Sequence, residues 1–238
     1  MNAQMAKALV EGTSRGKPSR AGLDDFAVEC AAELFLRDGL ESVKMVDIAE
    51  VAGVGVATLY RHFSTKARIA VRAAILLWER FNQRLVELVE SDAFLALNGL
   101  GRLQVLLEGY CDAYCVHDDF VTFVDSFDHM VLAGQVSSEE LEEYGAQLDS
   151  FYPIFEDAYL MGRSDGSIAR EIEFRKFYVA LAHALMGVAQ KINHGEIIPS
   201  DDFSNGREEL QSVVDMALWS LVTNIPAQRV RTDLQYEG

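Results

Sequence analysis

The stretch that decides the fold runs from Asp47 to Phe63 and reads DIAEVAGVGVATLYRHF, with Lys66 shortly beyond its end. Its apolar residues fall into two short runs with helical spacing, separated by Gly53-Val54-Gly55. Two short helices joined by a glycine-containing turn of a few residues form a helix-turn-helix. The second run carries polar side chains suited to contacts with phosphates and base edges: Thr58, Tyr60, Arg61 and His62.

Charge is distributed unevenly along the chain. The formal charge of −16 over 238 residues, taken as an average, disfavours binding to nucleic acid. Residues 1–72, however, hold 10 Lys and Arg against 9 Asp and Glu, whereas residues 73–238 hold 11 against 28. The first third is therefore electrostatically distinct, which indicates two functions. Phosphate contacts depend on where individual cations lie, so this first third is compatible with DNA binding.

Composition indicates a globular, cytoplasmic protein. Half of the residues are hydrophobic, yet no uninterrupted apolar run reaches the roughly 20 residues that a membrane helix needs. Residues 1–22 are small and polar without the apolar core of a secretory signal. The three cysteines, Cys30, Cys111 and Cys115, form no CxxC pair, which favours buried thiols over a disulfide framework or a metal site.

Helical periodicity continues along the chain, and no stretch alternates as a strand does. We expect an all-α protein with about nine helices. The predicted helices cover Asp24–Asp38, Met45–Ala52, Val56–Phe63, a long segment ending near Val89, a segment starting at Asn98-Gly99, Phe120–Leu132, one long helix from Ser137 to Leu160 kinked at Pro153, Glu171–His194 and Arg207–Thr223. Nothing between the third and fourth helices reads as a flexible linker, so the fourth helix is expected to move together with the helix-turn-helix.

The beginning of the chain resembles the DNA-binding domain of the TetR family of bacterial transcriptional repressors. The matching positions are Gly39, Ile48-Ala49, Ala52-Gly53-Val54, Thr58 through Phe63, and Lys66. The resemblance is specific over about residues 24–72, and beyond them only the architecture is shared. It implies an N-terminal three-helix DNA-binding domain over 23–70 and a helical ligand-binding and dimerisation domain over 71–238. Residues 1–22, where Gly, Ser and Pro interrupt any periodicity, are interpreted as a flexible basic arm, and an untethered tail without a role is the alternative.

Residues can be assigned to DNA contacts only where they match the family pattern. Thr58, Tyr60 and His62 occupy positions that hold phosphates in such repressors, and Lys66 matches a phosphate-binding lysine at the start of the fourth helix. The predicted DNA-binding residues are Lys44, Val56, Ala57, Thr58, Tyr60, Arg61, His62 and Lys66. A helix-turn-helix that has lost DNA binding and serves only in packing is the alternative.

Three positions depart from the family pattern. Lys44 replaces the usual Ser or Thr cap of the second helix, although its ammonium group can itself meet a phosphate. Val46 stands where many relatives carry a base-reading Arg, and Gly55 replaces the usual Ser cap of the third helix. With Val46, Val56 and Ala57 all apolar, hydrogen-bonded base readout is sparse. We infer that contacts with thymine methyl groups, Tyr60, Arg61 and DNA shape share the specificity.

The rest of the chain is rich in aromatic residues, each of which is also compatible with an ordinary core position. Together they could line an apolar ligand pocket. The candidate ligand-binding residues are Tyr110, Tyr114, Phe123, Phe127, His129, Phe151, Phe155, Tyr178 and His183. The strongly negative charge of this part favours a neutral or cationic ligand. His117, His129, His183 and His194 form no tight metal-ligand motif, so neither a metal site nor a cofactor is expected.

The resemblance implies a homodimer formed through the last two helices, and two-fold symmetry then predicts a palindromic operator. We expect a repressor that a small, largely apolar ligand releases from this operator. A body that responds to a protein partner instead of a small molecule is the alternative, and activation in place of repression stays open. An enzyme is not expected, since the sequence has no nucleophile elbow, phosphate-binding loop or HExxH motif.

Overall fold

The computed structural model describes residues 20–195 and 204–223. These residues form eleven helices and no strand: α2 (Arg20–Asp38), α3 (Met45–Val51), α4 (Val56–Phe63), α5 (Lys66–Val89), α6 (Asp92–Leu95), α7 (Gly99–Val116), α8 (Asp118–Leu132), α9 (Ser138–Asp149), α10 (Tyr152–Asp165), α11 (Phe174–His194) and α12 (Gly206–Val222). The prediction of an all-α protein is confirmed. Within these residues, no helix is long and apolar enough to cross a membrane.

Two differences from the predicted helices account for the larger number. A single turn, α6, lies between α5 and α7, where Ser91 caps it by accepting a hydrogen bond from the backbone N–H of Phe94. The prediction of one kinked helix over Ser137–Leu160 is wrong, because the helix is interrupted at Ser150-Phe151 and two separate helices form. Pro153 lies in the first turn of α10, a position where its missing N–H would have no helical partner anyway.

The chain divides into two compact units. Unit 1 contains the residues up to Phe81 together with Thr122–Leu148, and unit 2 contains Asn82–Val121 and the residues from Asp149 onward. Helix α5 therefore begins in unit 1 and ends in unit 2. The predicted basic arm of residues 1–22 lies outside the described residues except for its last three, which belong to α2. The functional division near residue 70 stays a prediction.

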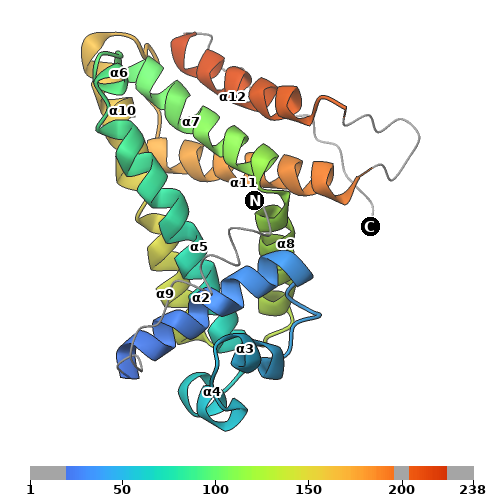
Figure 1. The fold of residues 1–238 in the computed structure, drawn as a ribbon. Coiled ribbons are helices and arrows are strands. Elements are labelled where there is room, and N and C mark those ends of the chain that lie inside the picture. The colour runs from blue at the N-terminus through green and yellow to red at the C-terminus, as the bar shows by residue number, and fades with distance from the viewer. Residues whose placement is uncertain (1–19, 196–203, 224–238) are drawn as a thin grey trace. The chain divides into compact units, whose positions relative to one another are not determined.

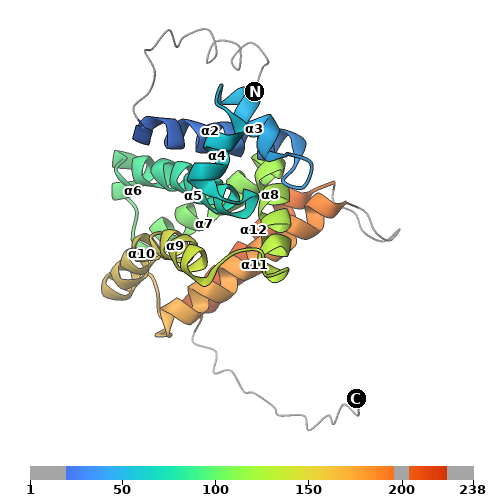
Figure 2. The same ribbon diagram turned by 90° about the horizontal axis from the view of Figure 1, so that it is seen from below.

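A row of aromatic side chains connects four helices of unit 1. Phe35 of α2 stacks on Phe123 of α8, with ring centroids 6.0 Å apart. Phe127, one turn further along α8, packs on Tyr144 of α9 at 5.0 Å. The indole Nε1 of Trp78 on α5 donates a hydrogen bond of 3.0 Å to the Tyr144 hydroxyl. Helices α8 and α9 consequently share one core with the predicted DNA-binding head, and Figure 2 shows α3 and α4 of that head beside α2.

Unit 2 is organised around α7, which contacts α10, α11 and α12; Figure 1 shows α7, α11 and α12 side by side. Helix α7 meets α10 at two glycines, Gly99 and Gly162, whose lack of side chains lets the backbones touch. The first N–H groups of α7 are satisfied from the end of α10. The Gly99 amide donates to the carboxylate of Asp165 at 2.8 Å, and the Leu100 amide donates to the hydroxyl of Ser167 at 3.0 Å.

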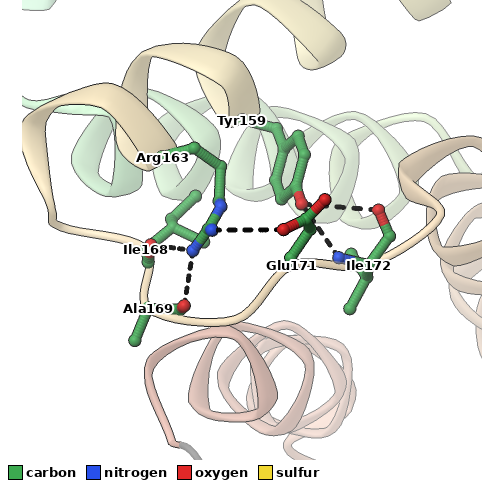
Figure 3. A network of polar contacts seen from close by, with 6 residues as sticks. All are labelled: Tyr159, Arg163, Ile168, Ala169, Glu171 and Ile172. Atoms are coloured by element: carbon green, nitrogen blue, oxygen red, sulfur yellow. Dashed lines mark hydrogen bonds and ion pairs between the residues drawn. The ribbon is translucent and has the colours of Figure 1, made fainter.

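The connection between α10 and α11 is held in place by a polar network (Figure 3). The guanidinium group of Arg163 donates to the backbone carbonyls of Ile168, at 3.0 Å, and of Ala169. The backbone amides of Ala169 and Arg170 in turn donate to the carbonyl of Leu221, at 3.1 and 2.9 Å. Leu221 lies in the last turn of α12, where carbonyl groups lack helical partners. The network therefore joins the ends of α10 and α12.

Candidate nucleic-acid interface

The helix-turn-helix of unit 1 is built by α3, a short turn and α4. Gly53 adopts a φ of +66°, a left-handed conformation that glycine reaches without steric cost. The amide of Val54 then donates to the Ala49 carbonyl at 2.9 Å, which closes the end of α3. Leu59 and Phe63, one helical turn apart on α4, are buried. Their burial fixes which face of α4 is turned outward.

Both helices of this motif begin without a side-chain cap. Lys44 and Gly55 are the N-cap residues: the ammonium group of Lys44 has no acceptor atom, and Gly55 has no side chain. At α3 the hydrogen bond at the helix start instead uses the side chain of Asp47, whose carboxylate accepts from the backbone N–H of Lys44 at 2.7 Å. The Lys44 side chain is thus left exposed at the start of α3. This agrees with the departures read from the sequence.

The outward face of the motif is mostly apolar. Five of the exposed side chains of α3 and α4 are grouped here as the reading face: Val46, Val56, Ala57, Tyr60 and Arg61. The four residues of α4 among them follow the i, i+1, i+4, i+5 spacing of one helix face. A helix of this kind fits into the major groove of DNA, where apolar side chains contact thymine methyl groups and Arg reads guanine.

His62 has a partner that the sequence did not indicate. Its Nδ1 atom lies 2.7 Å from a carboxylate oxygen of Asp24 on α2, and its side chain is 13% exposed. The sequence indicated a phosphate contact for His62 and only a helix start for Asp24. Pairing between side chains on separate helices has no local pattern that periodicity would reveal. The structure thus adds Asp24 to the candidate interface.

Lys66, also predicted to bind a phosphate, is engaged within unit 1. Its ammonium group donates to the backbone carbonyl of Glu41 at 3.1 Å, so it connects the start of α5 to the turn before α3. Burial lowers the pKa of Lys66, and the nearby carboxylates of Glu41 and Asp47 oppose that shift. An ammonium group has three donors, so one bond to Glu41 leaves others for a phosphate.

Four of the candidate ligand-binding residues meet in unit 2. Tyr110 stacks on Phe155 at 5.5 Å and packs on Tyr114 at 5.8 Å, while Phe155 packs on Tyr178 at 5.0 Å. The hydroxyl groups of Tyr110 and Tyr178 are 3.0 Å apart and hydrogen-bonded. Burial, followed by the neighbouring Tyr178 and Tyr114, raises the pKa of Tyr110 well above its ordinary value. Phe151, just before α10, is also buried in this unit.

The other candidates lie elsewhere. Phe123 and Phe127 belong to unit 1, in the aromatic row that also includes Tyr144, a residue not among the sequence candidates. His129 is exposed at the end of α8, where its Nδ1 atom bonds the Asp125 carbonyl at 2.8 Å. His183 is exposed on α11. Unit 2 therefore holds one group of packed candidate rings and unit 1 another, and the two histidines are exposed.

The fold and the exposed face of α3 and α4 are those of a helix-turn-helix DNA-binding protein. Residues 28–73 match the family model described as bacterial regulatory proteins, tetR family. This part of the chain is a TetR-type DNA-binding domain, as the sequence predicted for about residues 24–72. Among curated proteins, none matches the sequence.

Solved structures of known regulators share the fold at low sequence identity. The fatty acid degradation regulator FadR from Bacillus halodurans is 15% identical with a TM-score of 0.60, covering 85% of this chain and 97% of its own. A putative transcriptional regulator from Saccharomonospora viridis in complex with choline is 19% identical with a TM-score of 0.63, covering 82% and 97%. The ketosteroid transcriptional regulator KstR2 of Mycobacterium tuberculosis is 18% identical with a TM-score of 0.55, covering 87% and 97%.

Proposed function

We propose that this protein is a homodimeric, cytoplasmic repressor that binds a palindromic operator and is released from it by a small molecule. The observation that carries the proposal is the reading face of α3 and α4, flanked by the exposed Lys44. The apolar side chains of the reading face do not belong to the core of unit 1, which other residues form. A DNA groove would cover them.

Operator recognition in this proposal relies on shape and methyl groups more than on hydrogen bonds. Val46, Val56 and Ala57 offer no donors or acceptors, and in the major groove they match the C5-methyl group of thymine. Tyr60 and Arg61 are the polar members of the reading face. Lys44 adds a phosphate contact that carries no sequence information. The operator is therefore expected to contain thymines at the positions facing the start of α4.

Replacing a contacted thymine by uracil is expected to weaken operator binding roughly fourfold, because one buried methyl group contributes about 0.8 kcal/mol. Uracil keeps the Watson–Crick pairing, so the change isolates the methyl group. Single replacements can be scanned through an operator recovered from a random DNA library, with affinity measured by fluorescence anisotropy at fixed salt. In the matched variant Val56→Ser, the replacement at the position facing residue 56 should have no effect. A scan with no sensitive thymine contradicts methyl readout.

Dimerisation in this proposal uses α11 and α12, which pack on each other and expose large apolar residues. Two-fold symmetry would place the two α4 helices in successive turns of the major groove, about 34–36 Å apart or at a multiple of this distance.

The proposed effector is a largely apolar molecule that is neutral or cationic. Aromatic rings in unit 2, including Tyr110, Tyr114, Phe155 and Tyr178, pack on one another, and a ligand that moved between them would meet apolar surface and ring faces that attract cations. The excess of acidic residues after residue 72 disfavours an anion. The Saccharomonospora viridis regulator was solved with choline, a cation of this kind, which supports testing quaternary ammonium compounds first.

Release would act through α5. This helix runs without a break from Lys66 to Val89, with its first part in unit 1 and its last part in unit 2. A ligand that binds one arrangement of α5 more tightly than another would change the distance between the two helix-turn-helix motifs of the dimer. The required difference in ligand affinity between the two states is about 1–3 kcal/mol or more.

The experiment that tests this function has two stages. The full-length protein is first offered a random DNA library, and repeated selection should recover a palindromic sequence. The protein–operator complex is then titrated with quaternary ammonium compounds, steroids and fatty acids, and one class should dissociate it. If no sequence is enriched, DNA recognition is refuted. If an operator is found but no compound releases it, a protein partner of the C-terminal part becomes the better account of the response.

A further inference from the structure

Residues 166–173 connect α10 to α11 and, within unit 2, also lie against the end of α12. Ile168 anchors this connecting segment on α10, because it is 1% exposed and its backbone N–H donates to the Gly162 carbonyl at 2.9 Å. A β-carbon at Gly162 would lie 2.6 Å from the Ile168 Cδ1 atom, so the glycine makes room for this side chain. Near the other end of the segment, the Tyr159 hydroxyl accepts from the Ile172 N–H at 3.0 Å. The connecting segment is therefore held closely against α10.

Arg163, in the last turn of α10, fixes the middle of the connecting segment (Figure 3). Its guanidinium group donates to two successive backbone carbonyls, that of Ile168 at 3.0 Å and that of Ala169. Both bonds come from Nη1, a nitrogen with two N–H donors. The ion pair of Arg163 with Glu171 is weak by comparison, because its atoms are 3.8 Å apart and the Glu171 side chain is 88% exposed. Arg163 therefore acts mainly on the backbone of the segment.

The connecting segment in turn completes the last turn of α12. The backbone N–H groups of Ala169 and Arg170 both donate to the Leu221 carbonyl, at 3.1 and 2.9 Å. The last four carbonyls of a helix have no partner within it, and that of Leu221 is one of these four in α12. Another, that of Trp219, accepts from the backbone N–H and the hydroxyl of Thr223. The end of α12 therefore depends partly on hydrogen bonds from a distant part of the chain.

The last turn of α12 also carries exposed apolar side chains. Trp219 and Val222 are 67% and 37% exposed, whereas Leu221 is fully buried. Hydrogen bonds to the carbonyl of the buried Leu221 keep the turn helical, and they thereby fix the direction in which Trp219 and Val222 point. A side chain held in one orientation associates at a lower entropic cost than one on a frayed turn. Fraying would therefore weaken association although no side chain of the dimer surface is altered.

We propose that Arg163 is a positioning residue for dimerisation, which holds the exposed apolar turn of α12 in place through the connecting segment. The inference rests on the proposed dimer formed through α11 and α12. By binding the carbonyls of Ile168 and Ala169, Arg163 keeps the segment placed so that its N–H groups reach Leu221. Helix α10 also supplies one of the packed candidate rings of unit 2. A ligand that displaced α10 would then loosen the dimer surface as well.

Arg163→Met is expected to weaken self-association of the full-length protein at least about tenfold, because ordering the frayed turn adds to the entropic cost of association. Sedimentation equilibrium measures the dimer dissociation constant. Arg102→Met is the matched control, since the Arg102 guanidinium also donates to two backbone carbonyls of unit 2, those of Leu95 at 2.7 Å and Leu97 at 3.1 Å, beside α6. This variant and Glu171→Gln should self-associate as the wild-type protein does.

Hydrogen exchange measured by mass spectrometry separates positioning from general destabilisation. In the wild-type protein, exchange at the amides of Ala169, Arg170 and Thr223 should slow as the dimer forms, because coupling between two equilibria is reciprocal. In Arg163→Met these amides should exchange fast at every protein concentration. An unchanged dimer affinity in Arg163→Met despite this faster exchange overturns the inference alone, as does an equal loss of affinity in Arg102→Met. A wild-type protein that stays monomeric at all concentrations overturns the proposed dimer as well.

Discussion

Replacing Gly99 by alanine is expected to lower the free energy of unfolding by about 3 kcal/mol. A β-carbon at this position would lie 1.9 Å from the backbone nitrogen of Gly162 and 2.3 Å from its α-carbon. These atoms belong to the backbone of α10, so no side-chain rotation can relieve the overlap. The two helices would have to move apart, and close-packed interiors tolerate such movement poorly.

Separation of α7 from α10 would also break the hydrogen bonds at the start of α7. Gly99 and Leu100 donate to Asp165 and Ser167 at 2.8 and 3.0 Å. Without these acceptors the amides must find water or remain unpaired, which adds to the cost of the substitution. The loss should therefore exceed that of an ordinary surface substitution several-fold.

The matched control for Gly99→Ala is Gly145→Ala in α9. A β-carbon at Gly145 has no heavy atom within 4 Å. Alanine in a helix interior is favoured over glycine, so this variant should gain about 0.5–1 kcal/mol. Urea unfolding followed by circular dichroism, at one protein concentration for all variants, gives both values. Equal stability of the Gly99→Ala and wild-type proteins would contradict the close approach of α7 and α10.

The sequence was sufficient to predict the helix-turn-helix of α3 and α4, because the patterns that specify this motif are local. Helical spacing of Leu59 and Phe63 and a glycine at position 53 predict the two helices and the turn between them, and α4 has the predicted bounds. Pro153 shows the limit of such signals. The apolar spacing continues across Ser150-Phe151, so periodicity alone does not distinguish one kinked helix from two helices, and tertiary packing decides.

Long-range pairings were beyond sequence reasoning for a different physical reason. Phe35 and Phe123 stack in one core although 87 residues separate them along the chain, and a single sequence carries no record of such a contact. The same holds for Asp24 and His62. Each residue had a satisfactory local interpretation, as a helix start and as a phosphate ligand, and only the packing of α2 on the helix-turn-helix brings them together.

Replacing Trp219 by aspartate is expected to convert the protein to a monomer at micromolar concentration and to reduce operator affinity by at least about 100-fold. Trp219 and Met216 lie three residues apart on α12, and their side chains are 67% and 65% exposed in the single chain. Val222, three residues further on, continues this face of the helix. Large exposed side chains grouped in this way mark interaction surfaces, and tryptophan dominates the energy of many interfaces.

The loss of DNA affinity follows from the loss of symmetry, since two linked heads bind a palindrome far more tightly than one head binds a half-site. Sedimentation velocity measures the association state, and anisotropy with the selected operator measures DNA binding. Leu132→Asp is the matched control, because Leu132 is 85% exposed but lies at the end of α8 in unit 1; this variant should remain dimeric and bind DNA normally. If Trp219→Asp stays dimeric while Leu132→Asp dissociates, the interface lies on α8 and not on α12. A wild-type protein that sediments as a monomer while binding its operator tightly would refute dimerisation as the source of affinity.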